Sequence, residues 1–231
     1  MPVRLEALSF DARDPAVPAA FWAGLLGREV VEEAQGVLLP GDDTQLGLRF
    51  VAGPTEPSGR ALHLHLTSTS PEDQQRTVDR ALGLGGRHVD VGQLPEEGHV
   101  VLGDPEGNLL CVIEPGNRFL AGCGHLAEVA CDGGRAVGVF WAAALDWPLD
   151  WDQDDETSIR SPRGGTRLSW GGASPDEPKV GRNRQRFDLV ADEPEPEADR
   201  LVGLGAARLT TTDAAVELAD PEGNELVVRR S

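Results

Sequence analysis

The sequence predicts an α+β protein built as two copies of one domain in tandem. The segment Asp-Pro-Glu-Gly-Asn occurs at residues 104–108 and again at 220–224, each time just before a short apolar run. The pair Phe-Trp at residues 21–22 returns at 140–141. These landmarks keep one order at a spacing of roughly 120 residues, a domain length that is too long for the unit of a solenoid. Strand and helix patterns within each copy follow the order β-α-β-β-β twice.

The first such unit is predicted to span residues 5–51. A short strand at 5–10 leads to Asp14-Pro15, in which Asp is a favourable N-cap and Pro suits the first helical position. The helix ends at Gly27, since glycine readily adopts the left-handed conformation that closes helices. Three strands are expected next, at residues 29–33, 36–39 and 45–51.

The second unit begins with a strand at residues 61–66 that alternates strictly between leucine and histidine. Successive strand side chains point to opposite faces, so the leucines share one face while His63 and His65 share the other. Ser70-Pro71 then predicts a helix start. Its glycine-rich end at 82–86 precedes strands near 88–91, 99–102 and 109–113.

Residues 125–229 repeat this series of elements. The polar segment 175–184 matches an earlier polar loop, and Asp192–Pro196 begins the last helix. We therefore expect a first domain over residues 1–115, a linker at 116–121 and a second domain over 122–231.

Composition narrows the possible functions. The formal charge of −18 argues against nucleic acid as a partner, because phosphates are bound by basic side chains. No apolar run reaches the length of a membrane span and no signal peptide is evident, which favours a cytoplasmic protein. The basic residues are almost all Arg, which is typical of a high-GC bacterial genome. Cys111, Cys123 and Cys131 are odd in number and lack a C-x-x-C pair, so buried free thiols are expected.

The ordered, duplicated set of motifs resembles the glyoxalase/bleomycin-resistance/extradiol-dioxygenase superfamily, also called vicinal oxygen chelate. The Phe-Trp helix and the Asp-Pro-Glu-Gly-Asn turn look most like its glyoxalase-like domain branch. The resemblance implies that each domain consists of paired βαβββ modules whose mixed sheets curl around a cavity. It also implies that metal-dependent members carry ligands on the first, fourth, fifth and last strands of a domain.

This chain departs from that ligand pattern. The four positions of the first copy fall on Ala7 (with Glu6 beside it, pointing the other way), Gly47 or Leu48, His63 and Cys111. Those of the second copy fall on His125 or Leu126, on Ser169, Arg186 and Val227. Neither set suits a divalent ion, so we expect no metal and no cofactor. An unusual metal site that uses His125, Glu128 or Glu225 is an alternative.

The histidine strand supplies the candidate catalytic residues. His63 and His65 could act as a general base, since imidazole titrates near neutrality, or could be satisfied structural histidines. Cys111 is a candidate substrate-binding residue, although its apolar strand favours a buried thiol.

The second copy supplies further candidates for substrate binding. Arg186 and Asp188 could bind a carboxylate or phosphate, or could form an ion pair that fills a former site. Trp170 could stack on a flat ligand or pack in the core.

The leading functional interpretation is a metal-independent protein that binds a small organic molecule in one or both cavities. The alternatives are a lyase, isomerase or epimerase in which His63 or His65 moves a proton, and a divalent-metal enzyme with unusual ligands. The expected partner is a small molecule, with neither nucleic acid nor membrane involved. We expect a monomer that is an internal pseudo-dimer, or a weak homodimer.

Overall fold

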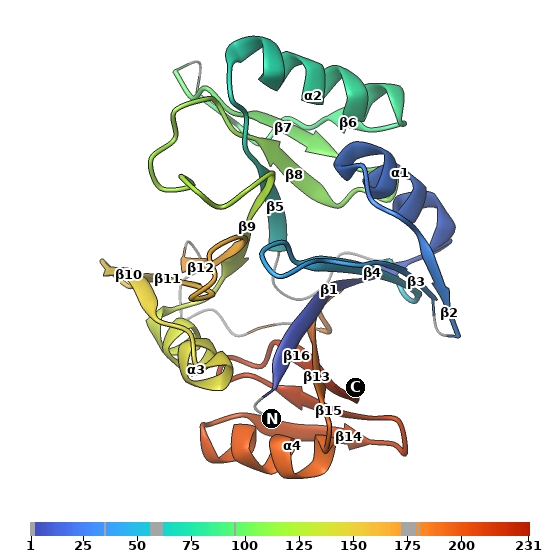
Figure 1. Ribbon diagram of the computed structural model, residues 1–231, viewed down its shortest axis with the longest axis vertical. Coiled ribbons are helices and arrows are strands. Elements are labelled where there is room, and N and C mark those ends of the chain that lie inside the picture. The colour runs from blue at the N-terminus through green and yellow to red at the C-terminus, as the bar shows by residue number, and fades with distance from the viewer. Residues whose placement is uncertain (1–2, 35, 56–61, 95, 172–178, 180) are drawn as a thin grey trace.

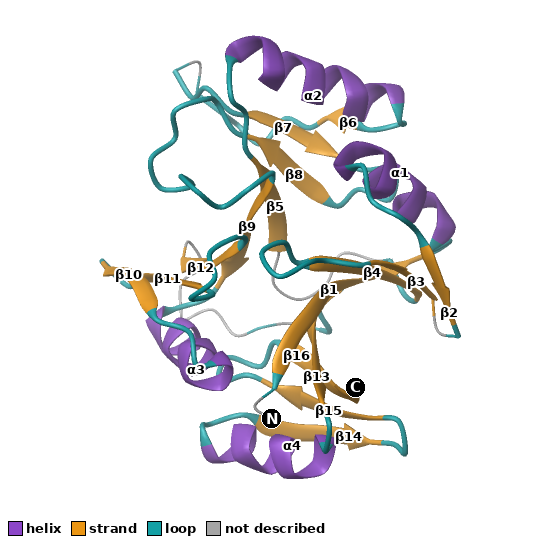
Figure 2. Ribbon diagram, viewed as in Figure 1, coloured by secondary structure: helices purple, strands orange, loops and turns teal. Residues whose placement is uncertain are grey.

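The structure is a computed structural model that describes residues 3–34, 36–55, 62–94, 96–171, 179 and 181–231. It contains four βαβββ modules, two in each repeat (Figures 1 and 2). Module 1 comprises β1 (Arg4–Ala12), α1 (Ala16–Leu26), β2 (Val31–Glu33), β3 (Gly36–Leu39) and β4 (Gly47–Ala52). Module 2 comprises β5 (Leu62–Leu66), α2 (Pro71–Gly83), β6 (Arg87–His88), β7 (Val100–Gly103) and β8 (Leu109–Val112).

The second repeat has the same order of elements. Module 3 comprises β9 (Leu126–Asp132), α3 (Arg135–Leu145), β10 (Leu149–Gln153), β11 (Glu156–Arg160) and β12 (Arg167–Gly171). Module 4 comprises β13 (Gln185–Ala191), α4 (Pro194–Gly203), β14 (Ala207–Thr211), β15 (Ala215–Ala219) and β16 (Glu225–Arg230). The predicted α+β class and the tandem repeat are thus confirmed.

The modules pair across the repeats. Sheet A has the order β14-β15-β16-β13-β1-β4-β3-β2 and joins module 4 to module 1. Sheet B has the order β10-β11-β12-β9-β5-β8-β7-β6 and joins module 3 to module 2. The expectation that each repeat pairs its own two modules is therefore wrong. All modules offer the same first-strand edge, so the sequence pattern alone does not select which two edges meet.

One core packs between the sheets and helices. It contains apolar side chains of all four modules, among them Phe10, Leu64, Val129 and Leu189. Alternate residues of each sheet face away from this core, and we call that side the open face of the sheet. The open face of sheet B carries a smaller apolar cluster that includes Leu120 of the segment between β8 and β9.

The first Asp-Pro-Glu-Gly-Asn turn, in module 2, contacts module 1 through a hydrogen bond. Asp104 accepts backbone hydrogen bonds from Glu106 and Asn108 through Oδ1, and Gly107 has a φ of 86° that favours glycine. Asp104 Oδ2 accepts a hydrogen bond of 3.0 Å from the indole Nε1 of Trp22 in module 1. The two most conspicuous motifs of the sequence are therefore structural and form one contact.

The helix ends follow the sequence signals closely. The side chain of Ser70 caps α2 by accepting from the backbone N–H of Asp73 at 3.2 Å. Gly27 ends α1 with a φ of 67°. Helix α1 begins at Ala16, one residue beyond the predicted position, and Asp14 accepts from its N–H. Among the described helices, none is long and apolar enough to cross a membrane.

Candidate functional site

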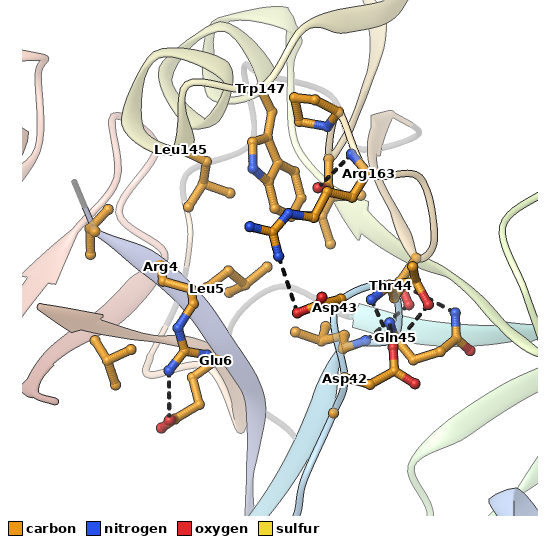
Figure 3. A pocket seen from close by; sticks show the side chains of 18 of the residues that line it. Arg4, Leu5, Glu6, Asp42, Asp43, Thr44, Gln45, Leu145, Trp147 and Arg163 are labelled. Carbon is orange, nitrogen blue, oxygen red and sulfur yellow. Dashed lines mark hydrogen bonds and ion pairs between the residues drawn. The ribbon is translucent and has the colours of Figure 1, made fainter. Parts of the chain in front are cut away.

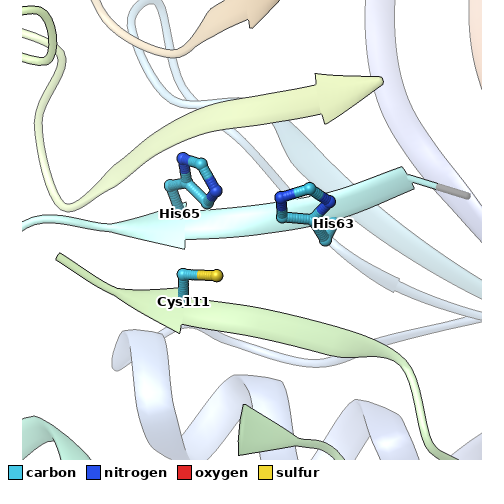
Figure 4. A group of neighbouring side chains, drawn as sticks. All are labelled: His63, His65 and Cys111. Carbon is cyan, nitrogen blue, oxygen red and sulfur yellow. The ribbon is translucent and has the colours of Figure 1, made fainter. Parts of the chain in front are cut away.

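The two histidines of β5 lie together on the open face of sheet B. Leu64 and Leu66 are buried in the core, while His63 and His65 on the opposite side are partly exposed. Their ring centroids are 4.8 Å apart. Cys111 on β8 lies directly across from His65, and ligand atoms of the three side chains fall within 4.8 Å of one another (Figure 4). Alternation along β5 thus places both imidazoles where the sequence predicted.

Glu128 completes this group from the other repeat. It lies on β9, which pairs with β5 so that Glu128 faces His65. Its Oε2 is 2.5 Å from His65 Nδ1, and Ser169 on β12 donates to its Oε1 at 2.5 Å. Glu128 is only 4% exposed. Because modules 2 and 3 share sheet B, each repeat contributes half of the site.

A bulge explains why Glu128 was hard to find in the sequence. The pairing of β5 with β9 shifts between His65 and Leu66, just as the pairing of β1 shifts between Leu5 and Ala7. Glu128 is therefore the structural equivalent of Ala7. The second repeat is also shorter at this point, since Phe140 lies twelve positions after Glu128, whereas Phe21 lies fourteen positions after Ala7.

The two residues that the sequence offered for the first-strand ligand position of the second repeat, His125 and Leu126, do not lie in the histidine cluster. Leu126 is buried in the core, and His125 precedes the strand, where its carbonyl accepts from the N–H of Thr67. Glu225, on β16 of module 4, forms an ion pair of 2.7 Å with Lys179, which precedes β13. Of the three residues considered for an unusual site, only Glu128 joins the histidines.

The surroundings of the two imidazoles shift their pKa values in opposite directions. Burial and the neighbouring charge of His65 lower the pKa of His63 to about 4. Burial also opposes a charge on His65, but hydrogen bonds with Cys111 and Glu128 outweigh it and raise the pKa of His65 to about 9. Burial likewise opposes a charge on Glu128, yet the bonds from His65 and Ser169 lower its pKa. At neutral pH the face therefore holds a neutral imidazole beside an imidazolium–carboxylate pair.

Aromatic and charged side chains lie next to this group. Arg167, which is opposite Glu128 on β12, forms an ion pair of 2.7 Å with Asp150. Its guanidinium carbon lies 4.0 Å from the ring centroid of Phe119, a residue of the segment between the repeats. Phe119 meets the 40% exposed Trp151 edge to face at 6.0 Å. These side chains give an aromatic boundary to the open face.

The equivalent position in sheet A is filled by ion pairs. Asp188 corresponds to His65 and is fully buried, and its Oδ2 accepts from Ser9 and from Arg49, each at 2.5 Å. Arg49 also pairs with Glu6 and Glu33 at 2.8 Å each. The expectation that Glu6 points the other way is thus wrong, because the bulge between Leu5 and Ala7 breaks the alternation.

Arg186 pairs with Asp11 at 2.8 Å, so the alternative of an Arg186–Asp188 pair does not form. Both side chains instead bind charged residues of module 1, which the cross-repeat pairing brings next to β13.

Trp170 lies on the core face of β12. It is 3% exposed and stacks on Trp141 with 6.4 Å between ring centroids. The hollow beside the two rings measures about 10 Å³. A hollow of this size leaves no room for an organic ligand.

The three side chains of this cluster could act as ligands of a metal ion. His63, His65 and Cys111 offer two nitrogens and one sulfur, a combination that suits Zn²⁺ better than oxygen-preferring Mg²⁺ or Mn²⁺. The contact of His65 Nδ1 with Glu128 is the kind of outer contact that orients metal-bound histidines. The three side chains therefore fit a soft divalent ion.

Comparison with known proteins gives the same fold. The family described as "Glyoxalase-like domain" matches residues 7–113 and again 127–229. Glyoxalase I from Zea mays superimposes with a TM-score of 0.65 at 13% identity, covering 99% of this chain and 92% of that one. A putative dioxygenase from Bacillus subtilis superimposes with a TM-score of 0.57 at 14% identity, covering 98% and 84%. No curated protein matches the chain.

The two matched regions together span most of the sequence. The chain therefore belongs to the glyoxalase-like domain family, with two copies of the domain in tandem.

Proposed function

We propose that the open face of sheet B binds a small carbonyl compound and moves a proton within it, as in an isomerase, epimerase or lyase. The observation that carries the proposal is the pair of imidazoles 4.8 Å apart, one of them held by a carboxylate. Their different pKa values support it, since a pair of groups with separated titrations can act as base and acid at one pH.

The roles follow from the charges. Neutral His63 accepts a proton from the carbon next to the substrate carbonyl. The electron pair left on that carbon moves to the carbonyl oxygen, where protonated His65 stabilises the negative charge by a hydrogen bond. Glu128 holds the ring of His65 and keeps it charged. Return of the proton to the opposite face of the same carbon gives epimerisation, and its return to the neighbouring carbon of a 2-hydroxycarbonyl compound, with a proton shift between the two oxygens, gives isomerisation. In a lyase reaction the electron pair of the enolate instead expels a substituent from the next carbon, and that leaving group takes the proton.

Proton exchange into D2O tests this function without a known product. Purified protein would be incubated with a panel of 2-oxo and 2-hydroxycarbonyl compounds, and deuterium uptake at carbon followed by NMR. We expect His63→Gln to slow the exchange at least about 100-fold while the fold stays intact. Equal rates for the variant and wild type on every exchanging compound would contradict the assignment.

A second candidate function is metal-assisted catalysis at the same residues, favoured by the cluster of His63, His65 and Cys111. A soft divalent ion held there would polarise a substrate carbonyl. Titration with Co²⁺ would then give a thiolate-to-cobalt absorption band that Cys111→Ser abolishes. If no such band appears, the metal candidate is discarded and proton transfer by the imidazoles remains.

The sequence argument for a protein that only binds its ligand depends on Trp170 as a stacking surface. In the structure Trp170 stacks on Trp141 in the core, so it is not open to a ligand. We therefore place proton transfer ahead of binding alone. We also propose that the protein is cytoplasmic, which its three buried free thiols support. We propose that it acts as a monomer, which the pairing of its two repeats within one chain supports.

A further inference from the structure

A large crevice lies away from the histidine site, between sheet A and module 3 (Figure 3). Its volume is about 1110 Å³. It is bounded by the start of β1, the turn between β3 and β4, the end of α3, the turn between β11 and β12, and the end of β13. None of its lining residues belongs to the cluster around His63.

The twofold repetition of the fold explains why this crevice is open. At the position related by this repetition, the corresponding gap holds the segment between the repeats. There Gln45 donates to the carbonyl of Cys123 at 2.9 Å, and Thr67 donates to that of Gly124 at 2.7 Å. Arg28, the equivalent of Trp147, reaches the carbonyl of Leu46 at 2.6 Å. No described segment takes this place between β16 and β1, so a ligand can occupy it.

The lining combines an apolar floor with an excess of negative charge. Leu5, Leu145 and the partly buried Trp147 form part of the floor, as Figure 3 shows. Five carboxylates line the crevice (Glu6, Asp42, Asp43, Asp146 and Asp192), against the two guanidinium groups of Arg4 and Arg163.

Both guanidinium groups lie beside carboxylates of the crevice, and one of these carboxylates, that of Glu6, also pairs with Arg49. Arg163 pairs with Asp43 at 3.1 Å, and Arg4 lies 3.5 Å from Glu6. An anionic ligand would therefore compete with carboxylates that are already in place, whereas a cation meets a lining with more carboxylates than guanidinium groups, beside the indole of Trp147.

We propose that this crevice is a second ligand site, which binds a small organic cation with an apolar body. The apolar body packs on the floor beside Trp147, and the positive charge lies toward the carboxylate of Asp146. The site is independent of the proposed proton transfer, because the two share no residue.

Two ions of equal size and opposite charge test the proposal. Tetraphenylphosphonium and tetraphenylborate differ chiefly in sign, so titration calorimetry with each separates charge recognition from apolar adsorption. We expect saturable, salt-sensitive binding of the phosphonium ion, one per chain, and much weaker binding of the borate.

Two substitutions locate the binding. Asp146→Asn removes one carboxylate and suits the local φ of 54°, which asparagine tolerates. It should weaken phosphonium binding about threefold. Trp147→Leu should weaken it about tenfold. Glu29→Gln removes an exposed carboxylate beyond the equivalent end of α1, and His63→Gln alters the other site, so neither should change the affinity.

The proposal is overturned if phosphonium fails to bind, if the borate binds equally well, or if both Asp146→Asn and Trp147→Leu leave the affinity unchanged. A change caused by His63→Gln would place the cation at the histidine site and would also overturn it. If Trp147→Leu does not fold, Asp146→Asn against Glu29→Gln decides the outcome.

Discussion

His65 is the residue whose surroundings change its chemistry most clearly. Its pKa of about 9 lies above the ordinary value of 6.5, so folding favours the protonated form. This stability is fully present below pH 6.5 and is lost as the pH rises through 9. Over that window we expect the difference in unfolding free energy between wild type and His65→Gln to shrink by up to roughly 3 kcal/mol.

Urea denaturation at several pH values measures this difference, and the exposed His88→Gln serves as the control. A wild-type advantage that stays constant from pH 6.5 to 9 would show that His65 is not held in its charged form. At this scale the sequence placed His63 and His65 correctly on one face, because alternation along a strand is a local property. Glu128 was only one of three alternatives, because a bulge shifts its register.

Turns between strands carry the contacts that join the two repeats. Gly165, in the turn between β11 and β12, has a φ of 89°, and a Cβ there would lie 1.6 Å from the carbonyl oxygen of Thr44. The adjacent Gly164 has a φ of 85° but no atom within 4 Å of such a Cβ. Both substitutions to alanine incur backbone strain, of roughly 1 kcal/mol, and only Gly165→Ala adds a clash between backbones.

We therefore expect Gly165→Ala to lower the free energy of unfolding by at least about 2 kcal/mol more than Gly164→Ala. Equal effects of the two substitutions in chemical denaturation would mean that the turns do not touch. The helices and strands of the first repeat were predicted well from sequence. Caps such as Ser70 and Gly27 and the alternating strands depend on neighbouring residues, and the structure changes their limits by only a few positions.

We expect the whole molecule to unfold as one cooperative unit, although the sequence suggested two domains. Each sheet takes one module from each repeat, and a single core includes all four. We expect calorimetry to show one unfolding transition whose calorimetric and van't Hoff enthalpies agree. Two resolved transitions would indicate repeats that fold separately. The pairing could not be read from the sequence, because each repeat has equivalent first-strand edges and the choice between them depends on the connecting segments.

Cys111 and Glu128, the latter from the second repeat, together keep a histidine of the first repeat protonated. An NMR titration of the two ring signals, on protein freed of metal by a chelator, tests it most directly. We expect pKa values of about 4 for His63 and about 9 for His65, and we expect Glu128→Gln to move the pKa of His65 back toward 6.5. Two histidines that both titrate near 6.5, with or without Glu128, would contradict it.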